Sequence, residues 1–250
     1  MESHAFFDIN DFEKIMISFF CVFSFRKTME MLCRQGRYPW FFVMLKSQKG
    51  SVAEVVKPLQ LLKKEKIKME RIIKTVTGKF TQETLDFVEK VFTEYSDEEE
   101  GKLVRELVAE IRSKKYYIPE LDLMMVNEKE EVIGYVMFSG FHLEGNYEKE
   151  LLLLSPAAVK TELQRQHISK ELIEYGFGVA KKLGYKAVIV EGNPQNYHAR
   201  GFRTSADYGI VPGEMVHLPD IACLMVKELE PGALEHIKGQ VNYDFYEALR

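Results

Sequence analysis

The segment from residue 151 to residue 191 constrains the fold most, because its pattern predicts a strand, a loop, a helix and a second strand. Leu151 to Val159 is too apolar for a half-exposed strand, so we expect it near the centre of a sheet. Residues 168–183 repeat apolar side chains at helical spacing, and Gly184 is a typical residue for ending a helix. Ala187 to Val190 follows as the second strand. Such a unit implies parallel pairing through a right-handed crossover.

The segments before this unit predict antiparallel pairing. Arg71 to Val76 is a short strand candidate, and residues 81–92 and 103–111 carry apolar side chains at the three-four spacing of amphipathic helices. Leu121–Val126 and Val132–Phe141 flank an acidic turn and predict a hairpin. Together these elements imply an α/β (α+β) fold with a mixed, mostly antiparallel central sheet and flanking helices.

The first 68 residues differ in character from the rest, so we expect an N-terminal extension followed by a domain over residues 69–250. Residues 26–75 contain 13 Lys or Arg and 4 Asp or Glu, whereas residues 83–110 contain 10 acidic and 3 basic residues. We expect the extension to be a helical hairpin or a poorly ordered segment. A basic, aromatic-rich arm for nucleic acid or an anionic membrane surface is the alternative. A native start at Met69 also fits the pattern, and the intact mass of the native protein would test it.

Composition excludes several classes of protein. A net charge of −4 over 250 residues argues against a chain that is nucleic-acid-binding as a whole. The longest apolar run, residues 15–25, is far shorter than the roughly 20 residues of a membrane-spanning helix, and the acidic N-terminus does not resemble a secretory signal. Three cysteines, far apart, predict neither a disulfide framework nor a zinc site and suit a cytoplasmic protein. They are Cys21, Cys33 and Cys223, the last expected as a small core residue in a strand from Ile221 to Val226.

The loop that connects strand and helix, residues 160–168, is the first candidate site. The junction of a buried strand with a helix N-terminus presents unpaired main-chain N–H groups and the positive end of the helix dipole, which suit phosphate oxygens. Because every strand–helix–strand unit has such a loop, topology alone favours a plain connection.

Several short motifs follow one another in a fixed order from this loop onward. They are Leu154-Ser155-Pro156-Ala157-Ala158-Val159, Gln164 to Ser169, Lys181 to Gly184, Gly192-Asn193-Pro194, Asn196-Tyr197 leading to Gly201-Phe202, and the tail patterns Glu228 to Leu234 and Gly239 to Tyr243. In this order they resemble the GNAT N-acetyltransferase superfamily, and more closely its YhbS-like bacterial branch. The resemblance covers about residues 69–250.

The resemblance implies the GNAT fold, with acetyl-CoA as co-substrate and no metal. In the family, the strand that here ends at Val159 separates from its neighbour, and its main chain pairs with the pantetheine arm. The following loop cradles the pyrophosphate at the helix N-terminus, and a main-chain N–H near Val159 polarises the thioester carbonyl. The implied cofactor-binding residues are Ala157, Ala158, Val159, Gln164, Arg165, Gln166, His167, Ile168, Ser169, Lys170 and Asn193.

Tyr197 is the catalytic residue that the resemblance implies. It stands four residues before Gly201, which is the family's spacing for a tyrosine that protonates the departing CoA thiolate. A tyrosine that merely packs on a proline-containing turn is the structural alternative. The general base stays open: His142, Glu148 and Glu150 flank the expected acceptor cleft, and each also fits a solvated surface group.

Five positions depart from the family pattern. His167 and Ser169 stand where the family has glycine, which allows a close approach to phosphate and unusual φ angles. The imidazole would either obstruct a phosphate or donate a hydrogen bond to it, whereas Ser169 suits a helix start. Asn196 and the pair Ala199-Arg200 depart on the acceptor side, so the acceptor is not carried over from relatives.

The leading hypothesis is an acetyl-CoA-dependent N-acetyltransferase that transfers acetyl directly to a primary amine of a small molecule or peptide. The acidic stretch Asp97 to Glu100 would suit a cationic acceptor, although a solvated helix start explains it equally well. One alternative is a non-catalytic CoA or acyl-CoA sensor, or a degenerate GNAT module. Another is an interaction protein that uses its basic segment on nucleic acid. The chain after Glu230 would pack on its own domain or on a second copy, forming a homodimer.

Overall fold

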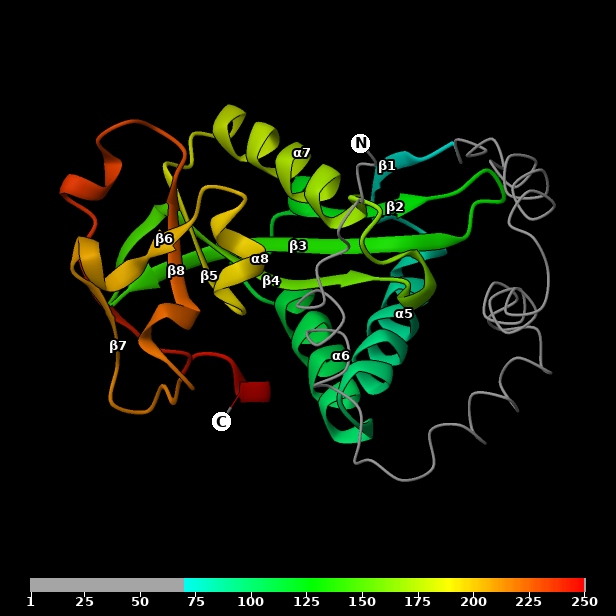
Figure 1. The fold of residues 1–250 in the computed structure, drawn as a ribbon, viewed down its shortest axis with the longest axis horizontal. Helices are drawn as coiled ribbons and strands as arrows, with labels where there is room; N and C mark the ends of the chain where they lie inside the picture. The colour runs from blue at the N-terminus through cyan, green and yellow to red at the C-terminus, as the bar shows by residue number, and fades with distance from the viewer. Residues whose placement is uncertain (1–69, 250) are drawn as a thin grey trace, which may run out of the picture. The chain divides into compact units, whose positions relative to one another are not determined.

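The computed structural model describes residues 70–249. The expected extension over residues 1–68 and the alternative start at Met69 lie outside the described residues. In the described part, seven strands form the main sheet in the order β1-β2-β3-β4-β5-β8-β6 (Figure 1). They are β1 (Ile72–Thr75), β2 (Asp122–Val126), β3 (Val132–Leu143), β4 (Asn146–Val159), β5 (Ala187–Glu191), β6 (Arg203–Thr204) and β8 (Leu224–Glu228).

The pairing of these strands confirms the expected mixed sheet. In the described residues β4 and β5 pair in parallel, and every other neighbouring pair of this sheet is antiparallel. β4 lies at the centre of the strand order, as its apolar sequence predicts. The helix α7 (Ile168–Lys182) connects β4 to β5, which completes the predicted crossover unit.

Helices cover both faces of the sheet and divide the core in two (Figure 1). α5 (Phe80–Tyr95) and α6 (Glu98–Ser113) pack on one face, and α7 packs on the other. The apolar stripe of α7 that the sequence predicts is buried against the sheet at Ile168, Leu172, Ile173, Phe177 and Ala180. Leu183, the last residue of the predicted stripe, lies after the end of the helix and is exposed. Within residues 70–249, no helix is both long enough and apolar enough to span a bilayer.

The acidic stretch at Asp97 forms the start of α6. The Asp97 carboxylate accepts a hydrogen bond from the main-chain N–H of Glu100 at 2.9 Å, and Glu98 and Glu99 lie in the same first turn. Carboxylates at this end of a helix are stabilised by unpaired N–H groups and the helix dipole. Helix capping therefore explains the stretch without an acceptor.

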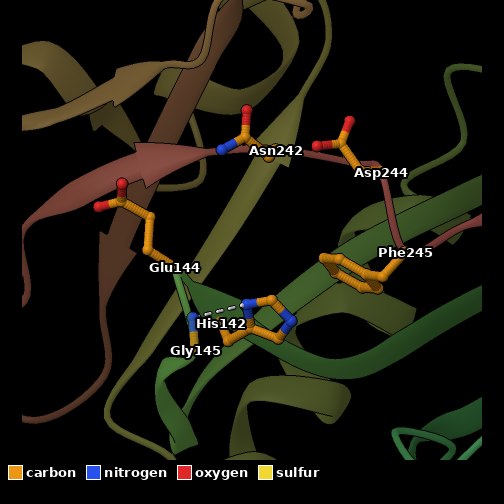
Figure 2. Close-up of a pocket in the computed structure, with 6 residues that line it drawn as sticks. All are labelled: His142, Glu144, Gly145, Asn242, Asp244 and Phe245. Atoms are coloured by element: carbon orange, nitrogen blue, oxygen red, sulfur yellow. Dashed lines mark hydrogen bonds between the residues drawn. The ribbon is translucent and has the colours of Figure 1, made fainter.

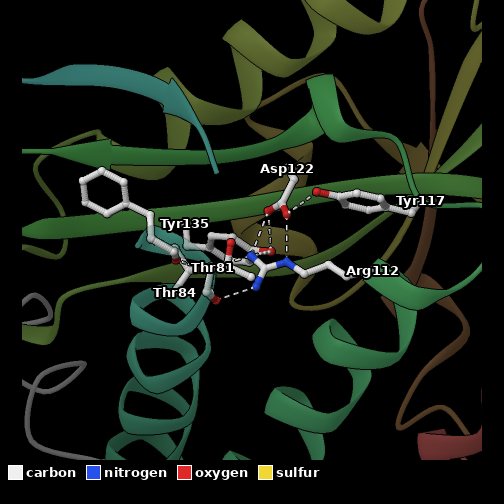
Figure 3. Close-up of polar contacts among 7 residues, drawn as sticks. Thr81, Thr84, Arg112, Tyr117, Asp122 and Tyr135 are labelled. Atoms are coloured by element: carbon white, nitrogen blue, oxygen red, sulfur yellow. Dashed lines mark hydrogen bonds and ion pairs between the residues drawn. The ribbon is translucent and has the colours of Figure 1, made fainter. Parts of the chain in front are cut away.

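A buried polar network fixes α6 to the sheet (Figure 3). Asp122, at the start of β2, is fully buried and accepts from Arg112 Nε at 2.8 Å and Arg112 Nη2 at 3.2 Å. It also accepts from the hydroxyls of Tyr135 at 2.7 Å and Tyr117 at 3.0 Å. Burial, reinforced by the Asp122 charge, raises the pKa of Tyr135 and raises the pKa of Tyr117 to about 12, so both phenols remain donors at neutral pH.

The same guanidinium continues the network into α5. Arg112 donates to the main-chain oxygen of Thr81 and to the hydroxyl of Thr84, both at 2.8 Å. Thr84 is itself fully buried and bonds back to the Phe80 carbonyl at 2.7 Å. One arginine therefore ties both helices to β2 and β3.

The chain after Glu230 packs against its own domain, which is the first of the two expected placements. β9 (Gly239–Val241) pairs in parallel with β7 (Ile210–Pro212) in a small second sheet. Tyr246 is fully buried beyond it, with its hydroxyl 3.3 Å from that of Ser139 on β3.

Cys223 is placed differently from the expectation. Residues Ile221–Cys223 form a 3-10 turn, and the strand β8 begins only at Leu224. The turn forms because the Asp220 carboxylate accepts from the Ala222 N–H at 2.8 Å. Cys223 is therefore half-buried in a turn instead of being a core residue of a strand.

Candidate functional site

The site begins where β4 and β5 separate. Their parallel pairing runs from Leu151–Ala187 to Leu153–Ile189, and no further pair of these strands forms in the described residues. β4 nevertheless continues to Val159, paired on its other edge with β3. The edge of β4 that faces β5 therefore carries unpaired main-chain groups beyond Leu153, which can bind an extended ligand as a strand does.

A bulge in β4 lies at this opening. Phe138 pairs with Leu154 and Val136 pairs with Ala157, so two residues of β4 face a single residue of β3. Bulges bend a strand and change the direction of its side chains, and they occur often beside active sites. Here the bulge redirects β4 at the point where β5 leaves it.

The register assigns different directions to the three predicted residues of β4. Lys160 N donates to the carbonyl of Ile133 at 3.1 Å, so Ala158, two residues earlier, also directs its main-chain groups toward β3. Ala157 and Val159 alternate with it and direct their N–H and C=O groups toward the opening. The predicted cofactor-binding role of Ala157 and Val159 agrees with this geometry. Ala158 is buried, and its main chain pairs with β3 instead.

The predicted phosphate loop lies between β4 and the N-terminus of α7. Ile168 is buried and anchors the helix. The N–H groups of Ile168, Ser169 and Lys170 lack intrahelical partners because they lie in the first turn, and no side chain among residues 70–249 caps that turn. The remaining predicted loop residues, Gln164, Arg165, Gln166 and His167, are exposed. The loop can therefore offer main-chain donors and the helix dipole to an anion.

His167 adopts the backbone conformation for which the family uses glycine. Its φ is 66°, in the left-handed region, and Arg165 in the same loop has φ 63°. A residue with a Cβ atom in this region costs roughly 1–2 kcal/mol. The chain therefore keeps the loop conformation that glycine would allow, at a cost in backbone strain.

We expect His167→Gly to stabilise the protein by about 0.5–1 kcal/mol, because relief of strain outweighs the greater freedom of glycine in the unfolded chain. Thermal unfolding should show a rise of roughly 2–4 °C for each kcal/mol. His167→Ala, which removes the ring and keeps the strain, is the matched control. A glycine variant no more stable than the alanine variant would contradict this account of the loop.

Two arginines hold the loop in place: Arg71, which the sequence did not single out, and Arg200, one of the departures from the family pattern. Arg71 donates to the main-chain oxygen of Gln166 at 2.8 Å and to its side-chain oxygen at 3.1 Å, and it pairs with Glu171 at 3.5 Å. Arg200 donates to the hydroxyl of Ser169 at 2.8 Å. Ser169 and Arg200 both depart from the family pattern, and the structure shows that they contact each other.

Tyr197 lies on the short helix α8 (Pro194–His198), which follows β5. Its ring packs edge-on against Phe202, with centroids 5.5 Å apart, and a side chain at Gly192 would come within 2.7 Å of the ring. Burial raises the pKa of the Tyr197 phenol, and the Arg200 guanidinium, 5.8 Å from the ring centre, offsets part of this rise. The phenol is therefore protonated at neutral pH, as a general acid must be.

Asn193 acts as the N-terminal cap of α8. Its side-chain oxygen accepts from the N–H of Gln195 at 2.9 Å. This contact fixes the turn that carries Tyr197, so the structure gives Asn193 a supporting position.

Two of the candidate bases from the sequence, Glu148 and Glu150, lie in the first part of β4, before the opening begins. Glu148 pairs with Lys115 at 3.0 Å, and Glu150 accepts from Lys186 at 2.9 Å and lies 3.0 Å from His236. These partners lower the pKa of both carboxyls. A carboxylate with a lowered pKa is a weak proton acceptor, so neither suits the role well.

The third candidate, His142, lines a pocket of about 360 Å³ beside the β3–β4 turn (Figure 2). Its Nδ1 accepts from the Gly145 N–H at 3.2 Å, and its ring lies 4.5 Å from that of Phe245. The other lining residues are Glu144, Asn242 and Asp244. His142 lies beside the hairpin turn and the C-terminal segment, and none of its contacts in the described residues reaches Tyr197.

Glu191 and Tyr243 were not found from the sequence. Glu191 ends β5 at the opening, and the Tyr243 hydroxyl donates to its carboxylate at 3.2 Å. An acidic residue directly after an apolar strand was the available signal. Among residues 70–249, no cluster of three or more His, Cys, Asp or Glu side chains could hold a metal ion.

Comparisons with known proteins agree with this geometry. The model of the acetyltransferase (GNAT) family matches residues 85–205. An uncharacterized N-acetyltransferase, YhbS of Escherichia coli strain K12, is 28% identical over 126 residues, which are 49% of this chain and 71% of that protein.

Two solved structures share the fold. One is the GNAT family N-acetyltransferase YhbS from Escherichia coli in complex with CoA, with a TM-score of 0.59, 23% identity and coverage of 69% of this chain and 88% of that chain. The other is a GNAT family acetyltransferase from Brucella melitensis in complex with acetyl-CoA, with a TM-score of 0.53, 22% identity and coverage of 73% and 99%.

These matches confirm the resemblance to the GNAT superfamily of N-acetyltransferases that the motifs predict, over residues 85–205. The similarity to YhbS agrees with the YhbS-like branch that the order of the motifs predicts.

Proposed function

We propose that this protein is an N-acetyltransferase that transfers the acetyl group of acetyl-CoA directly to a primary amine of a small molecule or peptide. The observation that carries the proposal is the opening between β4 and β5, which begins after Leu153–Ile189 and borders the uncapped N-terminus of α7. All of these elements, with Tyr197, lie within the domain that we assign to residues 69–250.

The donor site is formed mainly by main-chain groups. The N–H and C=O groups of Ala157 and Val159 would pair with the amides of a pantetheine arm in the opening. The N–H groups of Ile168, Ser169 and Lys170 would bind the pyrophosphate, and the positive end of α7 favours its charge. Burial of Leu151–Leu154 on both faces of the sheet, and pairing of Ala157 and Val159 with β3, keep these groups in position.

The Val159 N–H is aimed into the opening, so it would stabilise the negative charge that develops on the thioester oxygen. The amine nitrogen forms a bond to the acetyl carbon and loses one proton to solvent, and the carbon–sulfur bond breaks with its electron pair passing to sulfur. Tyr197 gives its phenolic proton to that sulfur and is reprotonated from solvent. Orientation of both substrates in one cleft supplies much of the rate.

The relatives support the donor half of the proposal. The Escherichia coli structure is a complex with CoA and the Brucella melitensis structure is a complex with acetyl-CoA. Their acceptors are not carried over, because Asn196 and Ala199-Arg200 depart from the branch pattern.

Thermal unfolding of the full chain with acetyl-CoA, desulfo-CoA or ATP tests the donor site. At about 100 times its Kd a ligand adds roughly 2.7 kcal/mol, so acetyl-CoA and desulfo-CoA should raise the unfolding temperature by several degrees. ATP, which lacks the pantetheine arm, should raise it little. No shift with acetyl-CoA would refute the proposal, and binding without transfer to any amine would favour a CoA sensor.

A further inference from the structure

Glu191 and Tyr197 lie on opposite faces of the sheet at the opening. Along β5, Ala187 and Ile189 belong to the core beneath α5 and α6, whereas Val188 and Val190 belong to the core beneath α7. Side chains of a strand alternate between its faces, so Glu191 lies on the same face as Ala187 and Ile189, which is the face covered by α5 and α6. Tyr197 packs against the core on the α7 side. A reacting group in the opening would therefore have a carboxyl on one side and a phenol on the other.

The surroundings of Glu191 differ from those of the other carboxylates near β4. Glu148 and Glu150 pair with cations, whereas the Tyr243 hydroxyl, at 3.2 Å, is the side-chain partner that the described residues give Glu191. Burial raises the pKa of the Glu191 carboxyl, and the hydrogen bond from Tyr243 offsets part of this rise. Glu191 is exposed at the end of β5, so its carboxyl is accessible at the opening and has no cationic partner among the described residues. An accessible carboxyl with a raised pKa is a candidate functional group.

The C-terminal segment after Glu230, here called the tail, places Tyr243 beside Glu191 through main-chain contacts. β9 pairs with β7, and the Gly213 N–H donates to the carbonyl of Val241 at 2.8 Å, two residues before Tyr243. The Tyr243 ring lies 6.1 Å from that of Phe141 on β3, on the α5–α6 side of the sheet. The tail motif from Gly239 to Tyr243 therefore delivers a hydroxyl to the end of β5.

We propose that Glu191 and Tyr243 form the acceptor subsite and that it takes a positively charged primary amine. This inference rests on the proposed acetyl transfer. The ammonium group gives one proton to the Glu191 carboxylate and becomes a neutral amine, which attacks the acetyl carbon from the α5–α6 side. A second proton leaves the nitrogen for solvent as the amide forms, and Tyr197 protonates the departing sulfur. Glu191 then releases its proton to solvent. Tyr243 is a positioning residue that orients the carboxylate.

The test compares full-length Glu191→Gln and Tyr243→Phe with wild type. Release of the CoA thiol is measured with propylamine, ethylenediamine, lysine methyl ester and alanine amide as acceptors, and acetyl-CoA binding is measured by thermal shift. Glu191→Gln should lower kcat/KM by about 100-fold, the usual scale for loss of a general base, with the thermal shift unchanged. Glu191→Asp should recover part of the loss. Glu131→Gln, the same change in the exposed β2–β3 turn, is the control and should leave the rate unchanged.

Tyr243→Phe keeps the ring and removes the hydroxyl, so it should lower kcat by about tenfold, the scale of one lost hydrogen bond. A purely structural role would instead lower the unfolding temperature and leave kcat unchanged, which would overturn the role of Tyr243.

One result would overturn the subsite: a wild-type protein that acetylates at least one of the four amines, with a Glu191→Gln rate near that of wild type. Failure of the proposed function gives a different result, because wild type would then show no thermal shift with acetyl-CoA or would bind acetyl-CoA and acetylate none of the four amines.

Discussion

Tyr197→Phe is expected to lower kcat for acetyl transfer by about 100-fold to 1000-fold, while the affinity for acetyl-CoA stays within about twofold of wild type. The substitution removes one hydroxyl and keeps the ring that fills the space between Phe202 and Gly192. The protonated phenol is what the departing thiolate needs, because its elevated pKa keeps the proton in place until sulfur takes it. Thiol release and acetyl-CoA thermal shifts, measured side by side, separate the two effects.

Tyr175→Phe is the matched control, since Tyr175 is about half exposed on α7 and removal of its hydroxyl should change neither rate nor binding. Equal rates for wild type and Tyr197→Phe would identify Tyr197 as a packing residue, which was the structural alternative from the sequence. If neither wild type nor Tyr197→Phe transfers the acetyl group but both bind acetyl-CoA, the sensor hypothesis replaces the enzyme hypothesis. The experiment therefore distinguishes all three interpretations.

The order of elements could be predicted because each depends on local periodicity. The crossover from β4 through α7 to β5 follows from a buried apolar strand, an amphipathic helix and a glycine, Gly184, with φ 89°. The start of β4 could not be predicted in the same way. It begins at Asn146, five residues before the apolar run, because Asn146 pairs with Leu143 next to the hairpin turn, beyond a shift in the register. Hydrophobic pattern detects burial, and strands extend beyond the buried part.

The donor side of the site could be predicted from ordered motifs, but the contacts that complete it could not. Tyr243 and Glu191 are 52 residues apart, and Arg71 reaches Gln166 across 95 residues. No local pattern encodes such pairs, because they depend on how the tail and β1 pack in the folded protein. The two departures at Ser169 and Arg200 seemed independent in the sequence, and only the fold shows that one bonds the other.

Asp122→Ala is expected to reduce the free energy of unfolding by about 3–5 kcal/mol, the usual cost of leaving a buried charge without its partner. Arg112 would keep its contacts with Thr81 and Thr84 but lose the carboxylate that balances its charge, and two tyrosine hydroxyls would lose their acceptor. Denaturant unfolding of the full chain measures the loss. For a domain of this size it corresponds to a fall of roughly 6–20 °C in Tm.

The loss of stability in Asp122→Ala is large because the ion pair is buried. An exposed ion pair offers a comparison. Glu148→Ala breaks the exposed pair with Lys115, at 3.0 Å, and should cost less than about 1 kcal/mol. The double variant Arg112→Met, Asp122→Leu removes both buried charges and should recover much of the stability lost in Asp122→Ala, since apolar residues of similar volume often replace a buried ion pair without loss. The double variant could instead be as unstable as Asp122→Ala. The network would then stabilise the fold more through its hydrogen bonds to α5 and β3 than through the pairing of its charges. The link between α5, α6 and the sheet would then depend on the geometry of the guanidinium, which no apolar side chain reproduces.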